Sequence, residues 1–304
     1  MTDADRGELA ILQQELDWVL SEEVPRVFTQ VMIVLQECCT HFPVPLCGSD
    51  TAVKQEKFIM STAAHSTQDQ VKCVVTVTGD TITQADINMK AAKHQNQVHR
   101  TSVTPDAPWR IQQIQDAGNF LQLAIQFLQG HGASTSFRTS SEVLNVLGQL
   151  IKLLQKGRSS LLIPRKKTID ELLSSKNMKS LTPPLPGDIA VSFYLQAHKL
   201  VLAVYHLSNS AGTMKFESVQ ADCAVPWLSP VLVCFTTALH LTHQLRDKIV
   251  QITSPHLYCG TMSHGLVFGN LLLSKYSTSC ESWKELVGVA CPCHPHISSE
   301  NMYY

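Results

Sequence analysis

The sequence is poor in the short motifs that mark common enzyme classes. It has no G-x-S-x-G nucleophile elbow, no G-x-x-x-x-G-K phosphate loop and no G-x-G-x-x-G dinucleotide fingerprint. It also lacks the C-x-x-C spacing of many redox and zinc sites. The sequence therefore offers no recognisable catalytic motif, and we predict no catalytic residue, no metal and no cofactor.

Charge and long apolar runs are also scarce. Charged residues make up 16% of the 304 residues, and the formal net charge is −1. No overall electrostatic field therefore favours nucleic acid or an anionic membrane. The best apolar candidate, residues 265–273, is far shorter than the ~20 residues that span a bilayer. We expect no nucleic-acid partner and no transmembrane segment.

Disulfide bonds are not expected either. The N-terminus, MTDADRGELA, is polar and acidic and does not resemble a signal peptide, which indicates a reducing, cytoplasmic compartment. The six cysteines that precede the C-terminal region lie in or beside periodic apolar segments, where a free thiol behaves as a small hydrophobe. These are Cys38, Cys39, Cys47, Cys73, Cys223 and Cys234.

The clearest feature that is present is a β-hairpin at residues 69–90. Cys73, Val75 and Val77 alternate with other residues on one face of an extended chain, and Gly79-Asp80 supplies a tight turn. The second strand is predicted to align Thr83, Ala85, Ile87 and Met89 on one face.

The polar face of this hairpin is the candidate partner surface. Its residues are Lys72, Thr76, Thr78 and Gln84. The alternative is that this face is merely solvated, because an antiparallel sheet commonly exposes one polar face to water.

Further β patterns accompany the hairpin and return later in the chain. They are predicted at residues 57–62, 97–103, 189–195, 200–207 and 215–223. The two β blocks are expected to combine into one antiparallel sheet.

Four amphipathic helical regions alternate with these β blocks. Pro25 is predicted to kink or break the first helix near Val24, because an internal proline removes a hydrogen bond. Thr139 and Glu142 have the spacing of a capping box, and the helix behind them is expected to stop at Gly157. The last region is predicted to start at Ser229-Pro230.

The patterns together predict an α+β protein. Residues 8–42, 109–157 and 226–252 are expected to form an antiparallel helical bundle, and residues 54–104 and 187–223 a β domain. Residues 158–186 are a Pro-rich connector with a short helix around Thr168–Leu173, and residues 253–304 are expected to be a poorly ordered tail.

The histidines are the main reason to consider a metal-binding or small-ligand enzyme. His240 and His243 lie three residues apart on a predicted helix, where two imidazoles can face one metal ion. No carboxylate or thiol at matching spacing completes this site, so we favour solvated or packed histidines. His198 and His206, near a predicted turn and a strand end, are the other candidates for a polar pocket.

The C-terminal tail carries one further cluster of metal-binding residue types. The segment CPCHPH contains Cys291, Cys293, His294 and His296. Its spacing is tighter than that of a folded zinc site, which draws pairs of ligands from separate segments. We favour the interpretation that it has no biological ligand.

Two other patterns have a plain and a functional interpretation. The triplet Arg165-Lys166-Lys167 is typical of either a solvated stretch or a nuclear or acidic-surface signal, and we favour the former. The leucine-spaced helices could form a self-associating zipper, but each stripe is short and lacks a regular charge pattern. Packing within one chain is therefore the favoured interpretation.

Several blocks of this sequence resemble the Rogdi family. They are KQEKFIMS at Lys54–Ser61, DQVK…TGD…QADIN at Asp69–Asn88, WRIQQIQDA at Trp109–Ala117, PLPGD ending at Asp188, KLVLAVYHL at Lys199–Leu207, and PWL…QLRDKI at Pro226–Ile249. The blocks keep the family's order and cover about residues 8–252. The segment Ser208–Val219 is shorter than in the family, so a strand or connection is expected to be missing there.

The resemblance implies an elongated protein without catalytic activity. It implies an adaptor subunit of RAVE-type complexes, which contain rabconnectin-type and WD-repeat partners and promote assembly of the vacuolar proton-pumping ATPase. It also implies a cytoplasmic protein that is peripheral on synaptic vesicles and at the nuclear envelope. The alternatives are the histidine-based enzyme and the leucine-zipper-like scaffold described above.

Overall fold

A computed structural model describes residues 3–48, 52–62, 70–91, 97–131, 136–210 and 213–253. These residues belong to one compact unit, Met1–Thr253. The predicted poorly ordered tail lies outside the described residues, apart from Thr253, and so does its cysteine and histidine cluster.

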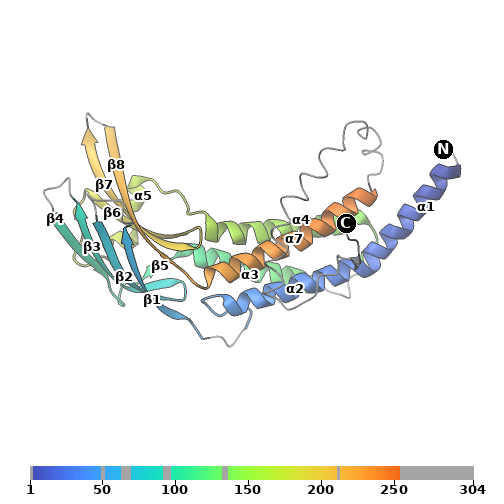
Figure 1. Ribbon diagram of the computed structural model, residues 1–304, viewed down its shortest axis with the longest axis horizontal. Helices are drawn as coiled ribbons and strands as arrows, with labels where there is room; N and C mark the ends of the chain where they lie inside the picture. Colours follow the sequence, from blue (N-terminus) through green and yellow to red (C-terminus); the bar gives the residue numbers. More distant parts are fainter. Residues whose placement is uncertain are drawn as a thin grey trace, which may run out of the picture. The chain divides into compact units, whose positions relative to one another are not determined.

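An antiparallel sheet of eight strands is assembled from two separate parts of the chain (Figure 1). The first part supplies β1 (Gln55–Thr62), β2 (Gln70–Thr78), β3 (Thr81–Ala91), β4 (Gln97–Val103) and the short β5 (Trp109–Arg110). The second supplies β6 (Ile189–Gln196), β7 (Lys199–Ser210) and β8 (Thr213–Ala224). The order is β4-β3-β2-β1-β8-β7-β6, with β5 paired to β3. The curled sheet confirms the predicted mixture of helices and an antiparallel sheet built from two segments.

The two parts of the sheet join where β1 pairs with β8. Ser61 lies opposite Asp222, and Thr62 lies opposite Ala221. The β7–β8 pairing continues to its turn, with Ser210 opposite Thr213. The predicted strand at residues 215–223 is therefore present, and the shortened segment has not removed it.

The alternation predicted for β3 was wrong at Thr83. The β2–β3 register shifts after the Thr76–Gln84 pair, so that Val77 lies opposite Ile82 and Thr83 is the extra residue of a bulge. A bulge breaks the strict period of two, so Ile82 becomes buried and Thr83 does not. Ala85, Ile87 and Met89 are buried as predicted, and the list of residues on that face changes only at the bulge.

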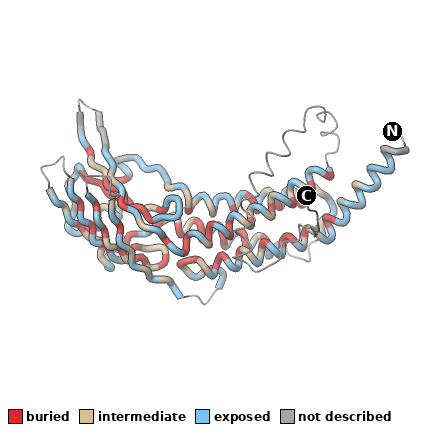
Figure 2. Tube along the Cα trace, in the orientation of Figure 1, coloured by how far each residue is buried: buried red, intermediate tan, exposed pale blue. Residues whose placement is uncertain are grey.

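Five longer helices, one π-helical turn and two short helices make up the helical part of the described residues. They are α1 (Asp3–Trp18), the π-helical turn η1 (Val19–Glu23), α2 (Val24–His41), α3 (Gln112–Gly130), α4 (Ser140–Leu162), α5 (Ile169–Leu173), α6 (Lys176–Lys179) and α7 (Leu228–Thr253). Their buried residues form stripes along the helices, as Figure 2 shows, and face the neighbouring helices.

The irregularity predicted near Val24 takes the form of the π-helical turn. The amide of Val24 donates to the carbonyl of Val19, which is the i→i−5 pattern. Pro25 then occupies the first turn of α2, where its missing N–H is tolerated. The chain is α-helical on both sides of this turn, so the helix is locally irregular here and is not broken. Glu23 of this turn forms an ion pair of 2.6 Å with Lys248 of α7.

Two predicted helix boundaries were displaced by tertiary contacts. Trp109 does not start a helix, because it pairs with Ile82 as part of β5. Gly157 does not end α4, which continues to Leu162. The missing side chain of Gly157 instead admits the ring of Phe235, since an added Cβ would lie 2.6 Å from Phe235 Cε1. Glycine here is a packing residue and not a terminator.

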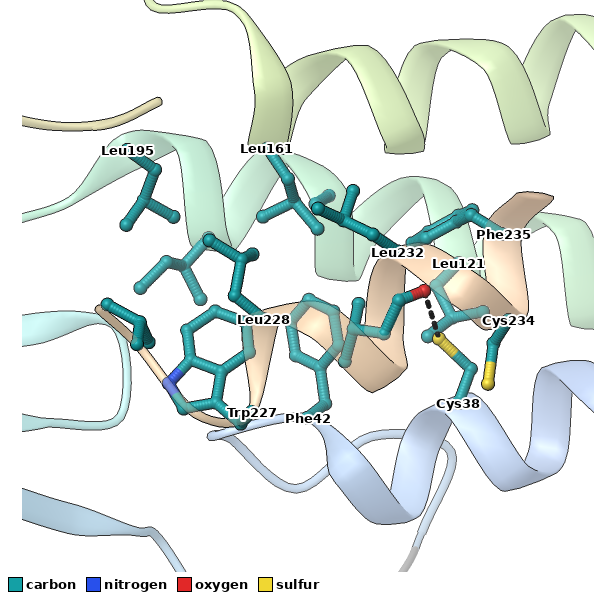
Figure 3. Close-up of a cluster of buried hydrophobic side chains, with 14 of the residues drawn as sticks. Cys38, Phe42, Leu121, Leu161, Leu195, Trp227, Leu228, Leu232, Cys234 and Phe235 are labelled. Atoms are coloured by element: carbon teal, nitrogen blue, oxygen red, sulfur yellow. Dashed lines mark hydrogen bonds between the residues drawn. The ribbon is translucent and has the colours of Figure 1, made fainter. Parts of the chain in front are cut away.

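The helices share one buried core near the sheet (Figure 3). The rings of Phe42, which follows α2, and Trp227, which precedes α7, have centroids 5.9 Å apart. Farther along, the thiol of Cys38 donates to the carbonyl of Val231 at 3.8 Å. These contacts join α2 to α7, and Cys38 and Val231 lie 193 residues apart in sequence.

Candidate functional site

The structure gathers the four residues of the predicted partner surface on one face of the β2–β3 hairpin. Thr76 pairs with Gln84, and strand alternation places Lys72 and Thr78 on the same face as Thr76. Lys72 and Gln84 are exposed, whereas Thr76 and Thr78 are half-buried. The Oγ1 atoms of Thr78 and Thr83 lie 3.3 Å apart, so part of this polar surface is bonded within the hairpin. Its use as a partner surface stays a prediction.

An apolar residue that the sequence did not draw attention to adjoins this face. Ile59 of β1 pairs with Val74 of β2, and its side chain is 79% exposed. Alternation places Val74 on the same face as Lys72 and Thr76. An exposed isoleucine within a polar sheet face adds a hydrophobic contact point to the predicted surface.

The histidines do not converge on one site. His240 is exposed and His243 is half-buried on α7, and burial and the charge of Arg246 lower the pKa of His243. His198 lies in the β6–β7 turn with a φ of 70°, and its Nδ1 is 3.3 Å from Ser229 Oγ. His206 lies far along β7, opposite Ile189. Within the described ranges, no group of three His, Cys, Asp or Glu side chains is arranged to hold a metal ion.

The buried cysteines act as packing residues in this part of the chain. All six cysteines of the described ranges are free thiols. Burial raises the pKa of Cys39 and of Cys73 to about 12 and that of Cys223 to about 11. The hydrogen bond with Cys234, together with burial, also raises the pKa of Cys38. These thiols are therefore held in the neutral form, which is a poor nucleophile.

A groove of about 620 Å³ lies beside the edge strand β6. One wall is the segment from Trp109 to Gln113, where β5 leads into α3. The other wall is the connector, from Pro164 to Lys167 and onward to Leu172 and Asn177. We call this feature the basic groove. Its floor comes from β6 and β7 and consists of Ala190, Ser192, Phe193, Tyr194, Tyr205 and Leu207.

The basic groove carries an excess of positive charge. Four cationic side chains line it, and Asp116 is its one carboxylate. Arg110 also lies 3.8 Å from Asp80, outside the lining. The remaining three cations are the consecutive residues Arg165, Lys166 and Lys167, all exposed. The groove thus combines apolar and aromatic residues on its floor with cations on both walls.

The carboxylate of Glu171 offsets part of this positive charge, because it interacts with the charges of Arg165 and Lys167. Thr168 caps α5 and forms a complete capping box with Glu171. The hydrogen bond from the Thr168 amide lowers the pKa of Glu171, and the charges of Arg165 and Lys167 contribute to the same shift. The box fixes where the connector turns into α5, and so it fixes the position of the basic triplet.

Sequence reasoning found the basic triplet but not the groove. A run of three cations in a Pro-rich connector is typical of a solvated stretch. The structure places this run in one groove with Arg110 and Tyr194. Arg110 lies 55 positions before Arg165, and Tyr194 lies 27 positions after Lys167. Only the fold brings these residues together.

No helix of the described ranges is both long and apolar enough to cross a membrane.

Comparisons with known proteins all lead to one family. A family model described as "Rogdi leucine zipper containing protein" matches residues 15–218. "Protein rogdi" from Drosophila melanogaster is 50% identical over 249 residues, covering 82% of this chain and 91% of the fly protein. "Protein rogdi homolog" is 38% identical in Danio rerio (84% of this chain, 98% of the fish protein) and 34% identical in Homo sapiens (83% and 96%).

Proposed function

Because the chain belongs to the Rogdi family, we propose that it is a non-catalytic adaptor subunit of a RAVE-type complex. In this role it binds rabconnectin-type and WD-repeat subunits and promotes assembly of the vacuolar proton-pumping ATPase. The observation that carries the proposal is the family match, which spans residues 15–218 and so includes most of the helices and the sheet.

The architecture is compatible with such a role. The sheet has an exposed face at Lys72 and Gln84, and the basic groove opens along its other end at β6. An adaptor needs separate surfaces for separate partners, and these two features lie on different strands of the sheet. In the proposal the helices form an elongated bundle that supports both surfaces.

The proposed setting follows from the same family membership. The protein is cytoplasmic and reaches vesicles, including synaptic vesicles, and the nuclear envelope through its partners. It enters the membrane-bound assembly by protein contacts alone.

Affinity purification of the tagged full chain from cells tests the proposal. We expect rabconnectin-type and WD-repeat subunits and subunits of the proton pump to be recovered. We also expect vesicles from cells that lack the protein to acidify more slowly, with recovery when the chain is restored. A folded chain that recovers neither class of partner would contradict the proposal.

A further inference from the structure

The basic groove lies over one face of β6 and β7 and reaches the edge of the sheet at β6, the end strand. Ser192 and Tyr194 of β6 share the lined face with Tyr205 and Leu207 of β7, whereas Phe193 belongs to the opposite face. Because Phe193 is also part of the lining, the groove extends to the edge of β6. The edge of a strand presents backbone N–H and C=O groups that can pair with another extended chain.

Two side chains cover the ends of this edge. Gln113 donates to the carbonyl of Leu195 and accepts from its amide, at 3.0 and 2.8 Å. The amide of Val191 donates to the sulfur of Met178 at 3.3 Å. Phe193 lies midway, and strand alternation directs its amide and carbonyl to the same side as those of Leu195 and Val191. Phe193 is 5% exposed, and in the described part of the chain no side chain is hydrogen-bonded to its amide or carbonyl as Gln113 is to those of Leu195.

The walls of the groove add a charge preference. Arg110 lies on one wall and Arg165, Lys166 and Lys167 on the other, against one carboxylate, Asp116. A segment that enters between these walls would meet cations on both sides and apolar groups on the floor. Carboxylates at alternate positions along an extended segment fit this arrangement, because alternate side chains of a strand point the same way.

A compact phosphate group fits less well than a peptide. Phosphate sites use donors that converge on one point. Here the cations are exposed and divided between two walls, and the covered ends of the β6 edge frame a length of backbone. A volume of about 620 Å³ also suits several residues of chain.

We propose that the basic groove binds an acidic, extended peptide segment of a partner protein, which lies along the β6 edge at Phe193 with its carboxylates between Arg110 and the Arg165–Lys167 triplet. This inference deepens the proposed adaptor function and rests on it for the source of the peptide. Main-chain pairing supplies part of the affinity, and the cations select the sign of the charge.

Direct binding to the purified full chain tests the chemistry of the groove. The probe is a short fluorescein-labelled peptide that alternates glutamate with valine, and its counterpart carries lysine in place of every glutamate. We expect the acidic probe to raise anisotropy and the lysine probe not to do so. The double variant Lys166→Glu with Lys167→Glu should weaken binding roughly tenfold, because two exposed attractive charges become repulsive.

A charge-matched control separates groove binding from general electrostatics. Lys90→Glu with Lys152→Glu makes the same change in net charge at two exposed positions outside the groove, on β3 and α4. Its affinity for the acidic probe should stay within about twofold of the wild type. Hydrogen exchange should show slower exchange at the amide of Phe193 when the acidic probe is bound.

Three outcomes would overturn the inference. One is an acidic probe that does not bind, and another is equal weakening by the groove and control variants. The third is groove-dependent binding to phosphatidylserine vesicles without binding to the acidic peptide, which would identify the groove as a lipid site.

Purification from cells distinguishes failure of the groove from failure of the adaptor role. Loss of one partner from the Lys166→Glu, Lys167→Glu variant, with retention in the control, supports both proposals. Recovery of every partner by the groove variant overturns the groove as a partner site and leaves the adaptor function standing. If the wild-type chain recovers no partner, the adaptor function fails, and with it the source of the peptide.

Discussion

Gln113 bonds to Leu195 as a neighbouring strand would. Its Nε2 donates to the carbonyl of Leu195 at 3.0 Å, and its Oε1 accepts from the amide at 2.8 Å. The same Nε2 donates to the carbonyl of Ser160 at 2.8 Å, near the end of α4. One side chain from α3 thus connects the edge of the sheet to a second helix. It satisfies backbone groups that a buried strand edge would otherwise leave unpaired.

Replacement of Gln113 by alanine should destabilise the protein by about 2–3 kcal/mol. The change removes three hydrogen bonds and leaves the amide of Leu195, a residue that is 1% exposed, without a partner. Urea unfolding followed by circular dichroism measures the loss. Gln112→Ala is the matched control, because Gln112 is exposed and its side chain donates only within its own helix, to Gln115 and Asp116. A loss for Gln113→Ala no larger than for Gln112→Ala would contradict this role.

The sequence could not predict this contact, because Gln113 and Leu195 lie 82 residues apart. Helical periodicity places Gln113 off the apolar stripe, where a glutamine is expected to face water. The helical periodicity predicted the helix correctly but gave no information about its contact with the strand edge. The basic groove could not be predicted from the sequence for the same reason, since its walls and floor come from three separate segments.

Local patterns predicted the elements well where local physics decides them. The turn at Gly79-Asp80, the strand 97–103 and the cap of α4 at Thr139 all depend on neighbouring residues. The errors arose where tertiary contacts prevail. Trp109 joins the sheet, and Gly157 packs against Phe235 instead of ending a helix. A single extra residue at Thr83 shifts the alternation of β3, and the periodicity of the sequence does not predict such a bulge.

Gly157→Ala should destabilise the protein by about 1–3 kcal/mol, although alanine is the better helix former. The new Cβ would lie 2.6 Å from Phe235 Cε1 and 2.8 Å from its Cζ, so a buried ring must shift. Gly148→Ala is the control on the same helix, where an added Cβ meets nothing within 4 Å. That variant should be stabilised by up to about 1 kcal/mol from helix propensity alone. Thermal unfolding of both variants measures the difference, and two changes of the same sign would contradict the packing argument.

Stability should fall as pH rises above about 9. Burial first, and the charge of Asp86 second, raise the pKa of Cys73 from its ordinary value of 9.0 to about 12. A group whose pKa is raised on folding contributes stability below the unfolded pKa and loses it as pH approaches the folded pKa. Cys39 and Cys223 act in the same direction. Urea unfolding between pH 7.5 and 10.5 should therefore show a declining free energy.

Cys73→Ala should make this decline shallower, because one buried thiol no longer resists ionisation. The control is Val75→Ala, which removes packing from the same face of β2 but no titratable group. That variant should lose stability at every pH and keep the wild-type slope. An identical slope in all three proteins would show that Cys73 does not contribute to the pH dependence.

Substitutions on the β2–β3 face test the partner surface predicted from the sequence. Lys72→Glu combined with Gln84→Lys changes two exposed side chains of this face and should leave the unfolding free energy within about 0.5 kcal/mol of the wild type. If the face binds a partner, recovery of that partner in affinity purification should fall several-fold. Ile59→Ser provides an uncharged test of the same surface, since Ile59 is 79% exposed beside Val74. Lys152→Gln on α4 is the control, because it changes the net charge by −1, as the double variant does. Full recovery of every partner by both surface variants would favour the alternative that this face is only solvated.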